Sequence, residues 1–183
     1  AQDCQFITHV GLRTKPYFTN ILYNISKLKG LGLSTFHKLE GYLMSVFSAP
    51  SFDNHEQVVF CNDPKTGLKA IIAVHSTAMG PAVGGCRMWD YASDEEALND
   101  VLRLSRGMSY KNAMANLGLG GGKSVIIGDS KTIKTPELMR SFGRFINSVG
   151  GKYYSAEDVG ISVEDIEEAS KETKFVAGLN KGE

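Results

Sequence analysis

Short runs of apolar residues and longer amphipathic stretches alternate along the chain after residue 44. Runs rich in β-branched and aromatic residues at 56–61 and 68–74 are typical of strands. The segment 62–67 between them contains proline and glycine, which predicts a hairpin turn. A third β-branched run at 124–127, bounded by a glycine, predicts a buried strand.

Helix signals separate these strands. The sequence Ser-Asp-Glu-Glu at 93–96 has the form of a capping box and predicts a long helix that continues to about residue 116. The remaining predicted elements are two helices, from 135 to 151 and from 162 onward, and two short strands, at 153–159 and 175–177. This alternation favours the α/β class, with a mixed, largely parallel sheet flanked by helices.

The first part of the chain follows a different pattern. In residues 1–43 the apolar residues occur only in short, separate groups and do not recur with a sustained period of 2 or 3.6 residues. We therefore expect an atypical N-terminal extension, either a flexible segment or sequence upstream of a functional start at Met44. The main domain is predicted at 44–179, and 180–183 is expected to begin a connection to a further domain.

Composition excludes several classes of function. Hydrophobic residues make up 42% of the chain and charged residues 22%, as in ordinary globular proteins. Lys plus Arg and Asp plus Glu both number 20, so no basic field favours nucleic acid or an anionic membrane. The three cysteines show no spacing typical of zinc ligands or a disulfide framework. Without a membrane-spanning run or a signal peptide, the sequence indicates a cytoplasmic protein with no metal site.

A glycine cluster followed by Lys123 is the strongest chemical signal. A P-loop requires glycine six residues before its lysine, and that position holds Leu117. A dinucleotide fingerprint starting at Gly118 requires a third glycine at position 123, where the lysine itself stands. The sequence instead predicts a glycine loop that enters a strand, with Lys123 at its mouth. The alternative is a solvated lysine at a loop tip.

Lys111 lies on the predicted long helix, on the same side as the apolar residues Leu104, Met108 and Ala115. Such a lysine either extends outward to solvent or points into a cleft at an anion, for which a carboxylate is the natural partner. If Lys111 and Lys123 share a cleft, repulsion and desolvation favour a neutral amine, which can act as a general base.

Other candidates lie in glycine-containing segments. The backbone at Gly84 and Gly85 is open to close approach by a ligand. Asp158 follows a predicted strand, where α/β proteins place ligand-binding groups, although a turn or helix cap is the simpler role for one aspartate. Three isolated polar residues show no metal-ligand or triad spacing and are assigned structural roles: His55, His75 and Arg87.

Taken in order, the stretches 80–89, 104–113, 120–129 and 156–160 resemble the N-terminal, substrate-binding domain of the amino acid dehydrogenases. This family includes the glutamate, leucine, phenylalanine and valine dehydrogenases, and the chain is most similar to the leucine enzymes. The resemblance covers about 44–179 and implies assembly into a homo-oligomer through this domain.

The resemblance also implies a role for each matching residue. Lys111 binds the substrate α-carboxylate, helped by the backbone near Gly84 and Gly85. Lys123 is the catalytic lysine that activates water, and Asp158 handles protons at the amino group. NAD accepts a hydride from Cα, and the products are a 2-oxo acid, ammonia and NADH.

Substrate class follows from one position. Family members that act on glutamate carry lysine immediately before the Gly-Gly pair, where this chain has Val83. With Val83 and Ala156 lining the pocket, a charged side chain loses solvation without gaining a partner, so an apolar amino acid of the leucine, valine or phenylalanine type is expected.

The family's NAD-binding domain does not follow within the 183 residues, so we expect a fragment that is inactive by itself. The alternative is a non-catalytic module that binds amino acids or oxo acids through Lys111 and does not need Lys123.

Overall fold

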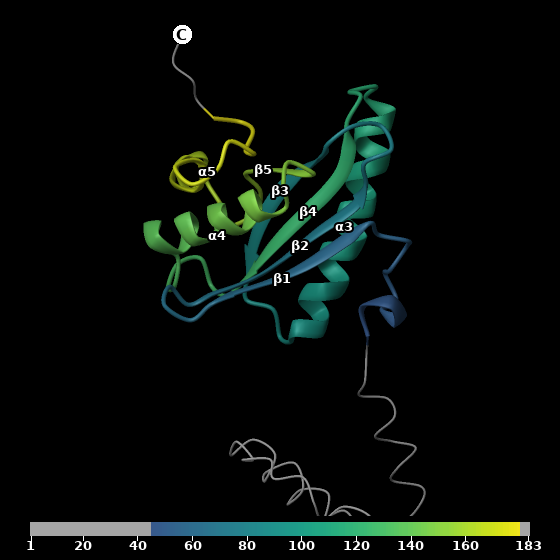
Figure 1. The fold of residues 1–183 in the computed structure, drawn as a ribbon. Helices are drawn as coiled ribbons and strands as arrows, with labels where there is room; N and C mark the ends of the chain where they lie inside the picture. Colours follow the sequence, from purple (N-terminus) through teal and green to yellow (C-terminus); the bar gives the residue numbers. More distant parts are fainter. Residues whose placement is uncertain (1–44, 180–183) are drawn as a thin grey trace, which may run out of the picture. The chain divides into compact units, whose positions relative to one another are not determined.

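The structure, a computed structural model, describes residues 45–179 as a five-stranded sheet with helices on both faces (Figure 1). The strands lie in the order β1-β2-β4-β3-β5. Their bounds are β1 Gln57–Asp63, β2 Leu68–Ser76, β3 Ala82–Trp89, β4 Gly120–Ile127 and β5 Tyr153–Ala156. The predictions for 1–43 and 180–183 lie outside the described residues.

The sheet is mixed, as the sequence predicts. β1 and β2 form the expected antiparallel hairpin, and β2 also pairs antiparallel with β4. β3 pairs in parallel with β4 on one side and with β5 on the other. Two of the four pairings among the described residues are therefore parallel, and both include β3, which lies beside the predicted site residues.

Three helices follow the predicted caps: α3 Asp94–Met114, α4 Pro136–Ser148 and α5 Val163–Ser170. The side chains of their N-cap residues Ser93, Thr135 and Ser162 each accept a backbone hydrogen bond from the first turn. One detail of the predicted capping box is wrong, because the Glu96 carboxylate accepts from the N–H of Ala92 instead of Ser93. A short 3-10 helix, η3 Val46–Ser48, precedes the sheet.

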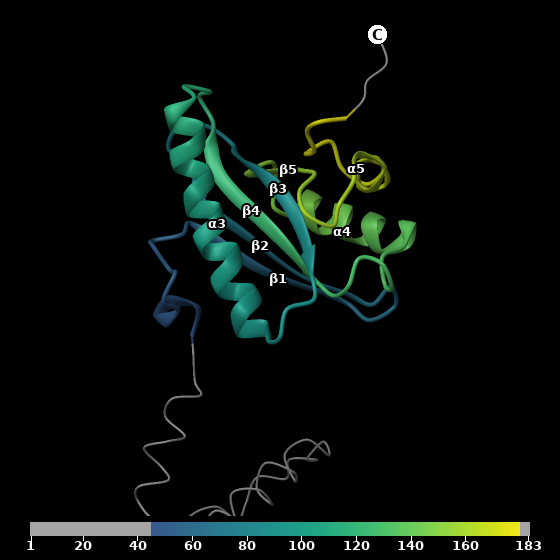
Figure 2. The same cartoon turned by 180° about the vertical axis from the view of Figure 1, so that it is seen from behind.

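The two faces of the sheet carry separate apolar cores. α4 covers one face together with α5, and α3 covers the other (Figures 1 and 2). The α4 face is closed by large, fully buried side chains, among them Leu68, Ile72, Phe142 and Ile146. α3 packs mainly over β2 and β4, where its core includes Ile71, Val101, Leu102 and Val125.

The glycine-containing segments differ from their prediction. The segment Gly80–Trp89, for which the sequence pattern predicts no strand, contains β3, and the cluster Gly120–Gly122 lies inside β4 instead of in a loop before it. Lys123 consequently occupies the middle of a strand, and the alternative of a lysine at a loop tip is wrong. Glycine weakens strand signals in a sequence, which explains why β3 and the first residues of β4 were not predicted as strand.

The last predicted strand is also shorter than expected. Residues 175–177 form one isolated bridge, between Val176 and Ser155 of β5, instead of a strand. Their backbone still continues the sheet edge, since Ser155 donates to the carbonyl of Phe175 and Ala177 donates to the carbonyl of Ser155. None of the helices within residues 45–179 combines the length and apolar character needed to cross a membrane.

Candidate active site

Lys123 is a buried lysine in the middle of the sheet. Its exposed fraction is 6%, and it stands one position after the glycine cluster of β4, opposite Ala73 of β2. Side chains alternate between the two faces of a strand, so Lys123 shares the α3 face with Val125. A buried ammonium group requires a compensating partner, because desolvation without one is strongly unfavourable.

The glycines before Lys123 serve packing. A Cβ atom at Gly121 would overlap the backbone N and the Oγ of Ser109 in α3. A Cβ at Gly122 would lie 2.6 Å from the ring of Tyr153. Since real Cβ atoms do not approach other atoms so closely, these glycines let α3 and Tyr153 press against β4 and fix the position of the next residue, Lys123.

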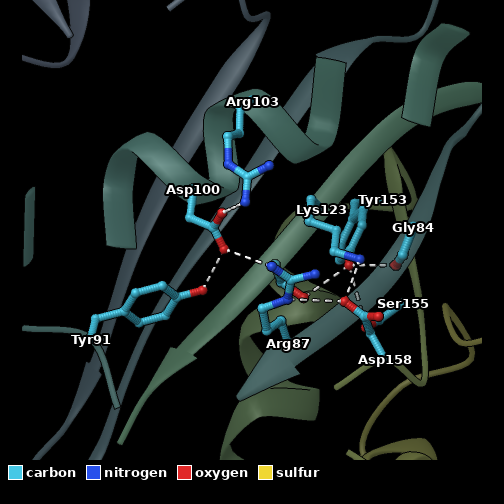
Figure 3. A network of polar contacts seen from close by, with 10 residues as sticks. Gly84, Arg87, Tyr91, Asp100, Arg103, Lys123, Tyr153, Ser155 and Asp158 are labelled. Carbon is cyan, nitrogen blue, oxygen red and sulfur yellow. Dashed lines mark hydrogen bonds and ion pairs between the residues drawn. The ribbon is translucent and has the colours of Figure 1, made fainter. Parts of the chain in front are cut away.

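Asp158 is the partner of Lys123. It lies in the loop after β5, and its Oδ2 is 2.7 Å from the Lys123 Nζ (Figure 3). Burial acts to raise the pKa of Asp158, but the close contact and charge of the Lys123 ammonium, with smaller contributions from the Val159 N–H and Arg87, outweigh it and lower that pKa. The structure thus brings together the two residues predicted to be catalytic, as an ion pair.

Gly85 lets the Asp158 loop cross β3. A Cβ atom on Gly85 would overlap the carbonyl oxygen of Glu157 and lie 2.8 Å from the Cβ of Asp158. The neighbouring Gly84 is equally constrained, because a Cβ there would overlap the carbonyl oxygen of Gly122. The parallel pairing of β3 with β4 is interrupted at these two glycines, so the sheet is irregular directly beside the ion pair.

Arg87 is a site residue that sequence reasoning missed. Its Nε lies 3.4 Å from the same Asp158 Oδ2, and its NH1 donates to Asp100 of α3 at 3.1 Å. Asp100 also accepts from the Tyr91 hydroxyl at 2.8 Å and pairs with Arg103 (Figure 3). Arg87, isolated in the sequence, is thus an ion-pair partner of both Asp100 and Asp158 in the fold. Its partners are distant in sequence, and only the Gly-Gly-Cys-Arg sequence offered a signal.

Buried polar groups also contact the strands that carry the site. The hydroxyl of the fully buried Tyr153 donates to the Gly84 carbonyl at 2.7 Å and lies 2.9 Å from the Ser124 Oγ. Burial raises the pKa of Tyr153, and it raises the pKa of Cys86 to about 12. Both groups stay neutral at physiological pH, which leaves the charge at this position to Lys123, Asp158 and Arg87.

Lys111 is not part of the ion pair. It is exposed in the last turn of α3, and no salt bridge joins it to any residue in 45–179. Its neighbour Asn112 is buried and donates to the carbonyl of Gly120 at 2.6 Å, which ties the end of α3 to β4. Met108, one turn earlier, has its Cγ 3.2 Å from the Cβ position of Gly84. The expected repulsion between Lys111 and Lys123 is replaced by the pairing of Lys123 with Asp158.

The remaining predicted residues surround the same edge of the sheet. Val83 and Gly85 alternate with the buried positions of β3 and are only partly buried. Ala156, also partly buried, is the register partner of Gly85 in β5. α3 packs mainly over β2 and β4, so it leaves the same face of the sheet largely uncovered at β3 and β5. A small molecule placed here would meet apolar side chains, glycine backbone and the Lys123–Asp158 pair.

Fold and site together define an α/β domain that presents a buried lysine–carboxylate pair at a glycine-lined strand, an arrangement suited to moving protons on a small substrate. Residues 55–175 match the family described as Glu/Leu/Phe/Val dehydrogenase, dimerisation domain. The chain belongs to this family of amino acid dehydrogenases.

Two curated relatives illustrate the similarity. The phenylalanine dehydrogenase of Caldalkalibacillus thermarum is 57% identical over 136 residues, which cover 74% of this chain and 37% of that protein. The leucine dehydrogenase of Geobacillus stearothermophilus is 54% identical over 137 residues, covering 75% and 37%. Identities this close do not separate leucine from phenylalanine as substrates.

A solved structure supports the same assignment. The crystal structure of L-tryptophan dehydrogenase from Nostoc punctiforme aligns with a TM-score of 0.66 and 49% sequence identity, over 68% of this chain and 37% of that one. The chain thus spans little more than a third of the length of the relatives it matches.

Proposed function

We propose that this chain is the substrate-binding and proton-handling part of an NAD-dependent L-amino acid dehydrogenase, which reversibly converts an apolar amino acid to the 2-oxo acid and ammonia. The observation that carries the proposal is the contact of 2.7 Å between the buried Lys123 ammonium and Asp158, beside the glycines of β3.

Proton transfer is the chemistry that this pair supplies. Deamination requires water to add at Cα of the oxidised substrate and the amino group to leave as ammonia, and both steps move protons. Lys123, when neutral, accepts a proton from the attacking water. Asp158 exchanges a proton with the substrate nitrogen. The short Nζ–Oδ2 distance lets the two groups share these protons without help from bulk solvent.

Substrate orientation is assigned to the residues around the pair. The exposed Lys111 ammonium near the Gly84 edge binds the α-carboxylate, with backbone N–H groups at Gly84 and Gly85 as further donors. Interrupted pairing with β4 supports this assignment for the backbone groups on that side, while both glycines remain paired with β5. The carboxylate then fixes Cα beside Lys123.

An apolar substrate side chain fits the walls of this region. Val83 and Ala156 are partly buried, aliphatic and carried by adjacent strands. Neither can neutralise a charged side chain, so a glutamate side chain would lose hydration without gaining a partner. We propose a substrate of the leucine, valine or phenylalanine type.

The described residues do not fit NAD. The glycines of β4 lie inside a strand and are filled from both sides by Ser109 and Tyr153, whereas a dinucleotide cradle requires glycines at the start of a helix. In this proposal NAD binds to residues other than those of the described domain. Residues 1–183 by themselves should give no NAD-dependent turnover.

Assembly and compartment complete the proposal. The matching family domain is described as a dimerisation domain, which supports a homo-oligomer formed through residues 55–175. Cys61 and Cys86 are free, buried thiols, which suits a reducing compartment such as the cytoplasm.

Titration of the 183-residue chain with 4-methyl-2-oxopentanoate and 2-oxoglutarate, followed by backbone amide NMR, tests the substrate site. We expect the apolar oxo acid to shift amides at Gly84, Gly85 and Lys123 and to bind more tightly than the diacid. Lys111→Ala should weaken binding roughly tenfold, the size of one lost charge-assisted contact. The matched control is Lys65→Ala, which changes an exposed lysine in the β1–β2 turn.

Equal affinity of Lys111→Ala and wild type would refute the carboxylate assignment. Stronger binding of 2-oxoglutarate would refute the apolar pocket. If the protein is only a binding module, Lys123→Ala should leave the function of the complete protein unchanged. If it is a dehydrogenase, Lys123→Ala should remove turnover.

A further inference from the structure

Arg87 and Asp158 share one unusual feature. The Arg87 Nε and the Asp158 Oδ2 are both buried and lie 3.4 Å apart, yet neither atom makes a hydrogen bond of normal geometry within residues 45–179. The short contact between Asp158 Oδ2 and Lys123 is likewise that of an ion pair. One carboxylate oxygen is thus held by two cations through charge, from two different strands.

Arg87 does not move freely between partners. Its NH1 is fastened to Asp100, whose exposed fraction is 8% and whose Oδ2 also accepts from the Tyr91 hydroxyl. Arg103 pairs with the other oxygen of Asp100. The charges alternate in sign from Arg103 through Asp100, Arg87 and Asp158 to Lys123, and they connect α3, β3, β4 and the loop after β5 (Figure 3).

The proposed chemistry creates a problem that this arrangement solves. Lys123 acts as a base only when it is neutral. If Asp158, at 2.7 Å, had no other cation beside it, it would keep Lys123 protonated, because a neutral Lys123 leaves the partly buried Asp158 carboxylate without a counter-ion. Arginine stays protonated at every pH at which proteins are folded. A fixed arginine on the same oxygen therefore keeps Asp158 balanced after Lys123 has lost its proton.

We propose that Arg87 is a positioning residue for the reaction: anchored by Asp100, it holds the Asp158 carboxylate beside Lys123 and remains its counter-ion when Lys123 gives up its proton. This inference rests on the proposed roles of Lys123 and Asp158. Arg87 itself does not touch substrate in this scheme.

Other charged or titratable groups around Asp158 do not supply the same balance. Cys86 and Tyr153 lie beneath the site and are neutral, since burial raises the pKa of the Cys86 thiol and of the Tyr153 hydroxyl. α3 contributes Asp100 and Arg103, which reach Asp158 only through Arg87. Lys123 is the group whose proton is exchanged. Within the described residues this leaves Arg87 as the permanent cation in contact with Asp158.

The test is a side-chain NMR titration of the 183-residue chain without substrate or cofactor, following the Asp158 carboxyl carbon. Arg87→Gln should raise the pKa of Asp158 by roughly half a unit or more, the lower end of what an adjacent arginine produces. Arg103→Gln is the matched control, because Arg103 is exposed, contacts Asp100 and does not contact Asp158. It should leave that pKa within about 0.2 of wild type. An unchanged Asp158 pKa in folded Arg87→Gln would overturn the proposal.

A second measurement needs no substitution of Arg87. In wild type, the Arg87 Nε–H resonance should shift with pH at the same midpoint as the Asp158 carboxyl, and this shift should vanish in Asp158→Asn. A resonance that does not follow the carboxyl would overturn the proposal even if Arg87→Gln fails to fold. Because neither titration involves turnover, failure here leaves the proposed dehydrogenase function standing, and loss of that function leaves the titrations interpretable.

Discussion

The two faces of the sheet are built from the same strands but serve different purposes. The α4 face is a continuous apolar layer in which Phe142 and Ile146 are fully buried, in one core with side chains of β2 and β3. The α3 face is equally apolar under the helix, over β2 and β4, but toward β3 and β5 it carries Arg87, Lys123 and Asp158. Stability is concentrated on one face, and chemistry lies on the uncovered part of the other.

β3 shows how one strand serves both faces. Its residues alternate between buried and partly buried positions, so Cys86 and Met88 belong to the α4 core while Val83, Gly85 and Arg87 face the site. A rigid core beneath a site holds side chains carried by strands, such as Lys123 and Arg87, in a fixed geometry. Changes on the α4 face should therefore affect folding, and changes on the α3 face should affect function.

The largest expected effect on stability is on the α4 face. Phe142→Ala removes a fully buried ring and should lower the free energy of unfolding by about 3–5 kcal/mol. Chemical denaturation of the chain measures this, with Phe60→Ala as control, since Phe60 is 57% exposed and should cost about 1 kcal/mol or less. Equal losses in the two variants would mean that the α4 layer does not dominate the core.

A smaller effect is expected where α3 meets β4. Gly121→Ala places a methyl group against the Ser109 backbone, which cannot move without shifting the helix, and should cost about 1–3 kcal/mol. Gly107→Ala in the same helix brings the new methyl group within 4 Å of no atom beyond its own stretch of helix and should stabilise the chain by up to about 1 kcal/mol. The melting temperatures of the two variants distinguish these outcomes. A Gly121→Ala chain that melts at the wild-type temperature would contradict the packing role of the glycine cluster.

The ion pair should contribute least to stability, and its contribution depends on pH. The pKa of Asp158 is lowered in the folded chain, so the ionised carboxylate stabilises the fold above the ordinary aspartate pKa of about 4. Asp158→Asn should cost about 1–2 kcal/mol at pH 7, because the neutral amide leaves the buried Lys123 ammonium without its counter-ion.

This cost should shrink as the pH falls from about 4 through the lowered folded-state pKa, where wild type also loses its charge. Urea denaturation at pH 7 and near pH 3 measures the difference, with the exposed Asp90→Asn as control. A cost that stays constant with pH would show that the loss of the ion pair is not its cause.

Regular parts of the fold could be predicted from sequence because each carries a local signal. The hairpin 57–76 has β-branched strands around a Pro-Gly turn, and α3, α4 and α5 start at Ser or Thr caps. β3 and the first half of β4 carry no such signal. Their glycines exist because Ser109, Tyr153 and Glu157 approach from other elements, which is information that no local pattern contains.

The site was predictable in part for the same reason. The family-like stretches identify Lys123 and Asp158 as candidates, but their contact depends on β5 joining the far edge of β3, which periodicity does not reveal. Arg87 was not predicted as a site residue because its partners, Asp100 and Asp158, come close to it only when α3 and the loop after β5 are folded against β3. Lys111 was placed correctly on its helix, where it is exposed, and the cleft shared with Lys123 stays a prediction.

The measurement that tests the account most directly is NADH formation from L-leucine and L-phenylalanine by the complete gene product, comparing wild type, Lys123→Ala and Lys65→Ala. Removal of the proposed base should lower turnover between about a hundredfold and ten-thousandfold, the range for a general base, with the fold retained. Lys65→Ala should match wild type. If Lys123→Ala keeps turnover within about twofold of wild type, the Lys123–Asp158 pair is not the chemical centre of this protein.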